Sequence, residues 1–321
     1  MYLVGDIGGT KTNLAWAVRD GEGWHLSDIS NQPSGDWSTL GDMIAEYVAD
    51  SDHTPDAACF GIAGPVINGR VQATNLPWII NESQLASQLG CKVRLLNDLE
   101  ALGHSIAALP PSALLNIHPG ESRDGNRALI AAGTGLGEAI LFHDGQRHQV
   151  SATEGGHCDF APQSELEIAL LRRLMKSHDH VSVERFVCGD GLAEIYAHLR
   201  DTGVPGSAQV EAEFEGTPRG ETVSKAALKG ACARSELAMR TFVALYGAEA
   251  GNLALKAMAT GGIYIGGGIA PKILERMTDG TFLSALQKKG RFTALVSAMP
   301  VNIILDDHAA LLGSAAVASH L

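Results

Sequence analysis

The stretch Tyr2-Leu3-Val4-Gly5-Asp6-Ile7-Gly8-Gly9-Thr10-Lys11-Thr12 predicts a buried strand that runs directly into a glycine-rich turn. A second stretch repeats this arrangement, because Ala128-Leu129-Ile130-Ala131-Ala132 leads into Gly133-Thr134-Gly135-Leu136-Gly137. Glycines lack a Cβ atom, so the backbone N–H groups of both turns can approach an anion closely, and the threonine hydroxyls add donors. Two such turns predict a clamp around a polyphosphate.

Neither turn matches a standard nucleotide-binding motif. In the first, Thr10 stands where the P-loop pattern requires its second glycine, and residues 13–18 are predicted to form a strand, not a helix. In the second, Glu138 replaces the third glycine of the dinucleotide fingerprint. The first turn is therefore predicted to be a hairpin-type phosphate loop. Asp6 would hold Mg²⁺ there, directly or through water, and its alternative role is to brace the turn.

Composition excludes several classes of protein. A chain of 321 residues that is 45% hydrophobic is large enough for two folded domains. The net charge of −12 argues against binding to nucleic acid or to an anionic membrane surface. Five cysteines, an odd number with no C-x-x-C pair, and the lack of an apolar stretch that could span a bilayer predict a reduced, cytoplasmic setting.

Strands alternate with helices along the chain, and each half opens with a strand, a glycine turn and a second strand. This echo predicts two related α/β domains that face each other across a cleft, with ligands in the crevice. A long helix is expected over residues 235–259, interrupted near Gly247 or Gly251, and the polar segment 205–223 is expected to be irregular. Further strands are predicted at residues 2–4, 14–18, 57–62, 92–97, 263–265 and 301–305, with a closing helix at 309–321.

Asn97 and Asp98 lie where a predicted strand ends and a helix begins. A kinase needs a carboxylate within hydrogen-bonding reach of the acceptor hydroxyl, and Asp98 is the candidate general base. The alternative role for Asp98 is to cap the helix, which Asn and Asp both favour. Asn97 would orient a neighbouring hydroxyl of the substrate.

The segment Glu154-Gly155-Gly156-His157 offers a hydrogen-bond acceptor and a donor–acceptor that suit a sugar. A purely structural histidine is the alternative for His157, and zinc ligation is disfavoured because Cys158 has no cysteine partner at ligand spacing. Glu184, taken alone, is predicted to be a glutamate on a helix surface. The glycine run 266–268 follows a short apolar strand, and it predicts either an adenosine pocket or tight packing.

Taken in order, these motifs resemble those of the bacterial glucokinases, a zinc-free family of the hexokinase–actin ATPase superfamily. The resemblance covers nearly the whole chain. It is carried by Gly5-Asp6-Ile7-Gly8-Gly9-Thr10, Gly61-Ile62-Ala63-Gly64-Pro65-Val66, Thr74-Asn75-Leu76-Pro77-Trp78, Leu96-Asn97-Asp98, Gly133-Thr134-Gly135-Leu136-Gly137, Glu154-Gly155-Gly156-His157-Cys158-Asp159-Phe160-Ala161-Pro162, Gly266-Gly267-Gly268-Ile269 and Leu311-Leu312-Gly313-Ser314.

The resemblance implies two actin-like, ribonuclease H-like α/β domains flanking a cleft. The smaller domain would span 1–108, completed by the helix 302–321, and the larger would span 109–301. The implied reaction is the phosphorylation of D-glucose at its 6-hydroxyl by ATP with Mg²⁺, in a cytoplasmic homodimer. Asp98 would be the base. Sugar ligands would be Asn97, Glu154, His157 and Glu184, and cofactor ligands Gly5, Asp6, Ile7, Gly8, Gly9, Thr10, Gly133, Thr134, Gly135, Gly267 and Gly268.

Two alternatives stay open from the sequence. Related kinases and repressors of the ROK group carry a cysteine-rich zinc motif after their E-x-G-H segment, but residues 159–167 contain no cysteine. A sugar-sensing repressor of that kind would also need a DNA-binding motif before the strand at Tyr2, and the −12 charge disagrees. A kinase for fructose, mannose or glucosamine, or a phosphoryl donor other than ATP, is compatible with the residues.

Overall fold

The computed structural model describes residues 1–21, 23–121, 123–216 and 219–321. The chain divides into two compact units. Unit 1 comprises Met1–Leu114 together with Asp306–Leu321, and unit 2 comprises Leu115–Leu305. The domain boundaries predicted after residues 108 and 301 fall a few residues before the limits of these units. No helix in the described part of the chain is both long and apolar enough to cross a bilayer.

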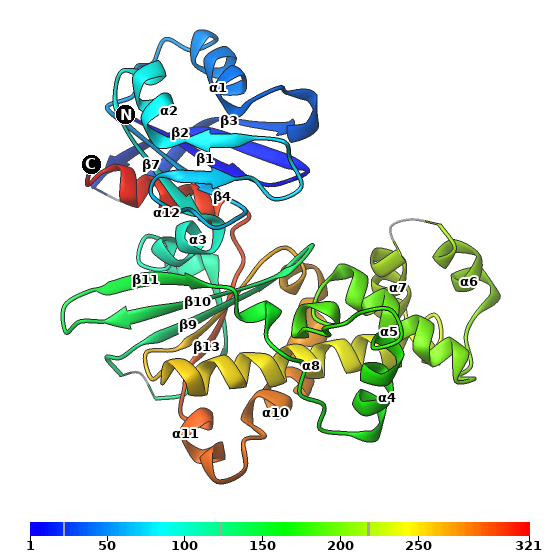
Figure 1. Ribbon diagram of the computed structural model, residues 1–321. Coiled ribbons are helices and arrows are strands. Elements are labelled where there is room, and N and C mark those ends of the chain that lie inside the picture. The colour runs from blue at the N-terminus through cyan, green and yellow to red at the C-terminus, as the bar shows by residue number, and fades with distance from the viewer. Residues whose placement is uncertain (22, 122, 217–218) are drawn as a thin grey trace. The chain divides into compact units, whose positions relative to one another are not determined.

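Unit 1 is built on a five-stranded sheet of order β3-β2-β1-β4-β7 (Figure 1). The strand β1 pairs antiparallel with β2 and parallel with β4, which pairs parallel with β7. The four strands predicted in this part of the chain are confirmed, although β1 and β2 are both longer than expected. The bounds are β1 Tyr2–Ile7, β2 Lys11–Asp20, β3 Gly23–Pro33, β4 Ala57–Ile62 and β7 Lys92–Asn97.

Helices cover both faces of this sheet. On one face, α1 (Leu40–Ala49) and α2 (Glu82–Leu89) share a core with the large side chains of the strands. On the other face, α3 (Asp98–Ser105) and α12 (Ala309–Ala318) pack through small residues. A Cβ atom on Gly313 of α12 would lie 1.8 Å from the carbonyl oxygen of Ala101 in α3. These two helices therefore approach each other at backbone distance.

Unit 2 repeats the pattern with a six-stranded sheet of order β11-β10-β9-β12-β13-β8. The strand β9 pairs antiparallel with β10 and parallel with β12, as β1 does with β2 and β4. The predicted echo between the two halves is thus confirmed at the level of sheet topology. The bounds are β8 Leu114–His118, β9 Arg127–Ala132, β10 Leu136–His143, β11 His148–Thr153, β12 Ile263–Gly266 and β13 Val301–Ile304.

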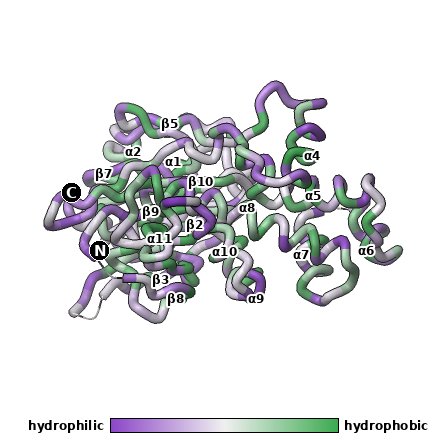
Figure 2. The backbone as a smooth tube through the Cα atoms, turned by 90° about the horizontal axis from the view of Figure 1, so that it is seen from below, coloured by the Kyte–Doolittle hydropathy of each residue, from purple (hydrophilic) through white to green (hydrophobic). Residues whose placement is uncertain are grey.

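The long helix α8 (Ala233–Ala257) runs without a break, so the predicted interruption near Gly247 or Gly251 is wrong. These glycines admit a neighbouring helix, α10 (Thr281–Gln287). A Cβ on Gly247 would lie 2.2 Å from the carbonyl oxygen of Phe282, and one on Gly251 would lie 2.3 Å from that of Leu286. The hydropathy of α8 can be followed in Figure 2.

Among the remaining elements, α5 packs into the core of unit 2. Ser164 caps α4 by accepting a hydrogen bond from the backbone N–H of Glu167, as the sequence pattern predicts. The bounds are α4 Glu165–Leu174, α5 Gly189–Asp201, α6 Ala208–Phe214, α7 Arg219–Leu228, α9 Leu274–Met277, α11 Thr293–Ser297, β5 Arg70–Gln72 and β6 Ile79–Asn81.

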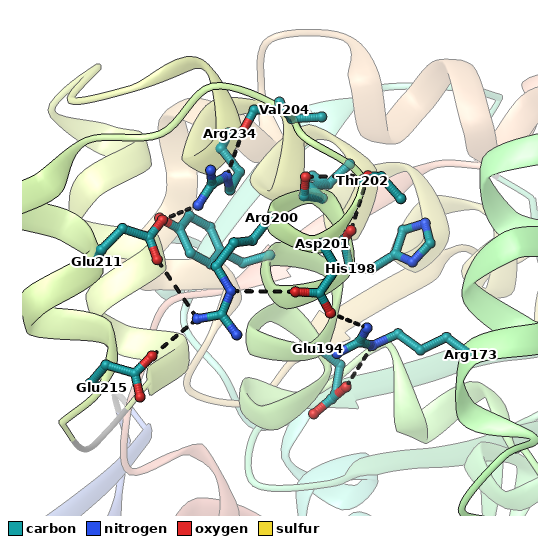
Figure 3. Close-up of polar contacts among 12 residues, drawn as sticks. Arg173, Glu194, His198, Arg200, Asp201, Thr202, Val204, Glu211, Glu215 and Arg234 are labelled. Atoms are coloured by element: carbon teal, nitrogen blue, oxygen red, sulfur yellow. Dashed lines mark hydrogen bonds and ion pairs between the residues drawn. The ribbon is translucent and has the colours of Figure 1, made fainter.

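The segment predicted to be irregular, 205–223, contains α6 and the start of α7, so that prediction is wrong; its residues 217 and 218 lie outside the described residues. The polar side chains of α6 form ion pairs with its neighbours (Figure 3). Glu211 pairs with Arg234 of α8, which is largely buried, and accepts a hydrogen bond from the Tyr196 hydroxyl at 2.8 Å. Glu215 lies 3.0 Å from Arg200 of α5. Tertiary ion pairs therefore hold α6, which the polar composition of the segment disfavours.

Replacing Glu211 should expose the dependence of this region on the buried ion pair. Glu211→Gln leaves the Arg234 guanidinium buried without its counter-charge, and we expect a loss of about 3 kcal/mol in the free energy of unfolding. The matched change Glu215→Gln removes an exposed pair and should cost less than about 1 kcal/mol. Urea denaturation of both variants measures the difference, and equal losses would contradict this account.

The close contact between α3 and α12 makes a second stability prediction. Gly313→Ala places a methyl group against the carbonyl oxygen of Ala101, and we expect a loss of roughly 1–3 kcal/mol from overpacking. Gly35→Ala is the control, since no atom lies within 4 Å of a Cβ at that exposed position. Thermal unfolding should show the lower midpoint for Gly313→Ala alone.

Candidate functional site

The first glycine turn joins β1 to β2 and is closed by backbone and side-chain hydrogen bonds. The Gly8 amide donates to the carbonyl oxygen of Lys11 at 3.0 Å. Ser34 anchors the turn from outside, because its hydroxyl donates to the Gly8 carbonyl at 2.8 Å and its amide donates to the Thr10 carbonyl at 3.0 Å. Ser34 is fully buried, and the sequence analysis missed it because it lies more than twenty residues along the chain. Thr10 itself is exposed.

The glycines of this turn serve the protein's own packing. Gly5 lies inside β1, where a Cβ would meet the Phe60 ring at 2.7 Å. A Cβ on Gly9 would meet the carbonyl oxygen of Thr74 at 2.9 Å. The Ile7 side chain is buried in the core. The structure therefore shows why side chains are excluded at Gly5 and Gly9 without reference to any ligand.

Asp6 is the charged group of this turn. Its carboxylate accepts one long hydrogen bond, from the Asn13 amide at 3.5 Å. Burial raises the pKa of Asp6, and the Asn13 hydrogen bond and the nearby His308 oppose that shift. A half-buried carboxylate with so little compensation fits a position beside a cation.

Asn97 and Asp98 end β7 and begin α3 in unit 1. The Asn97 side chain is the helix cap, because its Oδ1 accepts from the Leu99 amide at 2.9 Å. Its Nδ2 donates to the Gly64 carbonyl at 3.1 Å, which fixes the orientation of the side-chain amide. Asp98 is the first helical residue, and its Oδ1 also accepts from Leu99 at 2.9 Å. The capping role considered for Asp98 therefore belongs to Asn97.

Unit 2 brings together Glu154, His157 and Glu184, the three residues of this unit that the sequence analysis assigns to the sugar. His157 lies between the two glutamates, with Nε2 3.9 Å from Glu154 Oε2 and Nδ1 3.8 Å from Glu184 Oε1. His157 and Glu154 are exposed, whereas the Glu184 side chain is 26% exposed. Two carboxylates and an imidazole this close together in space can accept hydrogen bonds from hydroxyl groups and donate one to them.

Glu184 is not a helix-surface glutamate, so that prediction is wrong. It lies in a single 3₁₀ turn, Val183–Arg185, and its Oε2 accepts from the Leu136 amide at 2.8 Å. The glycine turn makes this possible, because a Cβ on Gly135 would lie 2.5 Å from that oxygen. Local sequence holds no signal for this contact, since the two residues are far apart along the chain.

The other glycines of unit 2 lie at the ends of β9 and β12. The Gly133 amide donates to the Gly135 carbonyl at 2.8 Å, and Thr134 at the tip of this turn is exposed. Gly267 has a φ of +80°, and its Cβ would lie 2.4 Å from the Ala132 carbonyl oxygen. A Cβ on Gly268 would meet nothing within 4 Å, so that position borders open space.

Glu138 of β10 is a buried carboxylate that the sequence analysis did not assign. It is 1% exposed, and its Oε1 has no hydrogen-bond partner among the described residues. A Cβ on Gly155 would lie 1.9 Å from Glu138 Oε2, so the carboxylate lies directly beneath the Glu154–His157 segment. Burial raises the pKa of Glu138 to about 7, Glu249 adds to the shift and Lys256 opposes it. The one feature of the sequence that could have identified Glu138 is its charge within a largely apolar strand.

The raised pKa of Glu138 predicts how stability depends on pH. From the ordinary pKa of 4.5 up to about 7, the folded carboxyl keeps a proton that the unfolded one releases, so stability falls as pH rises through this range. Glu138→Gln removes the effect. Between pH ~4 and pH ~8, the free energy of unfolding of the wild type should therefore fall by roughly 3 kcal/mol relative to that of the variant. Urea denaturation of both proteins across this range measures the gain, with exposed Glu46→Gln as control. A pH-independent difference would contradict it.

One cavity of unit 1 lies apart from the predicted residues. It has a volume of about 780 Å³ and is lined by residues of β7, α2, α3 and α12, including Glu82, Glu100 and His104. None of the predicted site residues lines it. Within the described residues, no group of three or more His, Cys, Asp or Glu side chains is placed to hold a metal ion.

Comparison with known proteins identifies the family of the chain. The family model of glucokinase matches residues 3–321. A glucokinase of Nostoc sp. is 41% identical, over 100% of this chain and 99% of that protein. The crystal structure of a glucokinase from an Antarctic psychrotroph is 29% identical, with a TM-score of 0.86 over 100% of this chain and 99% of that one. A ROK family glucokinase from Streptomyces griseus, solved with glucose and AMPPNP, is 21% identical, with a TM-score of 0.68 over 99% of this chain and 100% of that one.

The repeated sheets, the glycine turns at their strand ends and these likenesses define an enzyme, a sugar kinase of two actin-like α/β domains. Within that class, the chain belongs to the glucokinase family. The fold class and the family that the sequence resemblance implied are both confirmed.

Proposed function

We propose that this enzyme transfers the γ-phosphoryl group of ATP to the 6-hydroxyl of D-glucose, with Asp98 as the general base. The observation that carries the assignment of the base is the Asn97–Asp98 junction, where a capped helix start holds a carboxylate at the carboxyl end of β7. The relatives support the substrate, since they are glucokinases across the whole chain. They do not favour a sugar-sensing regulator or a kinase for another hexose.

Four residues are proposed to hold the sugar. Asn97 has one amide hydrogen and one acceptor lone pair left after its two protein contacts, and these suit a sugar hydroxyl. Glu154, His157 and Glu184 supply further acceptors and donors from unit 2. Glu184 is the most firmly held of the three, because the Leu136 amide fixes one of its oxygens and leaves the other for the sugar.

The glycine turns are proposed to hold the nucleotide. The residues Gly5, Asp6, Ile7, Gly8, Gly9 and Thr10 of the first turn would surround the phosphates together with Gly133, Thr134 and Gly135 of the second. Gly267 and Gly268 would border the adenosine, where the open space at Gly268 admits a ring. The Streptomyces griseus relative, solved with AMPPNP, supports ATP as the donor.

Asp6 is proposed to hold Mg²⁺, directly or through water. The half-buried carboxylate fits a cation, and Mg²⁺ in such enzymes is bound by one or two carboxylates together with the substrate phosphates. The ion would neutralise charge on the transferring phosphoryl group. The chain's own contribution is to place Asp6 beside a turn rich in backbone donors, at the end of β1.

The chemistry of the chain follows from these positions. Asp98 accepts the proton of the 6-hydroxyl as the oxygen bonds to the γ-phosphorus and the bond to the departing ADP oxygen breaks. Backbone donors of the turns stabilise the charge on the phosphoryl oxygens without reorganising. Positioning therefore supplies most of the rate, and the base supplies a smaller factor.

The cellular location and the oligomeric state of the enzyme are also proposed. A cytoplasmic location agrees with the use of ATP and with the five cysteines, which are all free thiols in the structure. A homodimer is proposed from the family resemblance.

Asp98→Asn tests the assignment of the base. The change keeps the shape of the side chain and leaves the Asn97 cap in place, so we expect turnover to fall by about 10²–10⁴-fold while ATP binding is retained. A coupled assay with glucose, fructose, mannose and glucosamine measures turnover, and calorimetry measures ATP binding. Glu100→Gln, two residues further along α3, is the control. Near-normal turnover in Asp98→Asn would falsify the role of Asp98 as general base. Faster wild-type turnover on another hexose would show that glucose is not the preferred substrate.

A further inference from the structure

Tyr246 is a fully buried tyrosine of α8 whose hydroxyl lies at the ends of two neighbouring strands. The Ala132 amide, at the end of β9, donates to this hydroxyl at 3.2 Å. The hydroxyl in turn lies 3.4 Å from the carbonyl oxygen of Ile130 and 3.4 Å from that of Gly266, the last residue of β12. One side-chain oxygen therefore contacts backbone atoms of both strands at the point where their pairing ends.

Both glycine turns of unit 2 start from these atoms. Ala132 is followed directly by the turn 133–135, and Gly266 by Gly267 and Gly268. The Ala132 carbonyl accepts a hydrogen bond from the Ile269 amide at 3.3 Å, and it lies 2.4 Å from the Cβ position of Gly267. The Ala132 residue is thus held on its N–H side by Tyr246 and on its C=O side by the second turn.

The ring of Tyr246 has little freedom to move its hydroxyl. Phe242 and Phe282 contact it edge-on, with ring centroids 6.2 Å and 5.6 Å away. Burial raises the pKa of the Tyr246 phenol, and the nearby Glu138 adds to the shift. The hydroxyl therefore stays protonated and can accept from Ala132 while it donates to a carbonyl oxygen.

We infer that Tyr246 is a positioning residue for the nucleotide, which sets the spacing between the turn 133–135 and Gly267–Gly268 from inside the core. The inference rests on the proposed nucleotide role of those turns. Tyr246 is buried beneath the strand ends, and it acts through the backbone at Ala132 and Gly266. Small displacements of groups that bind a polyphosphate are costly, because several hydrogen bonds depend on one geometry.

Tyr246→Phe removes the hydroxyl and leaves the ring. We expect the KM for ATP to rise roughly tenfold, equivalent to about 1.4 kcal/mol, while the KM for glucose stays within about twofold of the wild type. Calorimetric titration with ATP alone should show the same loss without turnover. Tyr196→Phe is the matched control, because Tyr196 is also fully buried in unit 2 and its hydroxyl donates to Glu211. It should lower the unfolding midpoint and leave both KM values unchanged.

The outcomes separate this inference from the proposed function. If Tyr246→Phe only lowers the unfolding midpoint, with the KM for ATP as in the control, the tyrosine is structural and the inference is wrong. Gly268→Leu tests the nucleotide site itself, because the new side chain enters open space without strain and should block ATP. Loss of ATP binding in Gly268→Leu with normal binding in Tyr246→Phe overturns the inference alone. Normal ATP binding in Gly268→Leu overturns the nucleotide site, and the inference with it.

Discussion

Close approach of backbone and polar groups at positions without a Cβ is the constraint on which this structure depends. The Glu184 carboxylate reaches the Leu136 amide because Gly135 leaves room for it. The Glu138 carboxylate lies beneath Gly155 for the same reason. At Gly135, a side chain of even one carbon would displace the Glu184 carboxylate that the proposed reaction uses.

The same constraint operates within the cores, away from the proposed site. Helix α12 touches α3 at Gly313, and α8 receives α10 at Gly247 and Gly251. These contacts bring helices together at backbone distance and leave the large apolar residues to fill the space beside the sheets. A glycine within a helix lowers helix propensity, but here the loss is offset by packing that no other residue permits.

Asp6 and Arg234, one charged group from each unit, differ in how they are paired. Asp6 of unit 1 is a half-buried carboxylate with one weak hydrogen bond, which suits a site that receives a cation with its ligand. In unit 2, Arg234 is buried but fully paired, and it ties α6 to α8 (Figure 3). The Asp6 carboxylate therefore has little compensation from the protein, whereas the Glu211 carboxylate is paired with Arg234 and stabilises the fold.

The sequence by itself determined the strands β1, β4, β7, β9 and β12, the doubled sheet pattern and the family, because these depend on local apolar runs and on glycines next to them. It also identified Asn97, Asp98, Glu154 and His157 as candidates. Only the tertiary structure decided that Asn97 is the cap, that Glu184 is held by the Gly135 turn, and that Glu138 and Tyr246 lie beneath the turns. The Asn97 cap is a local contact with the Leu99 amide, but the other relations join residues far apart along the chain, and sequence periodicity carries no information about such contacts. Helix α6 was missed for the same reason, because Glu211 within it and Glu215 just after it form ion pairs with other helices.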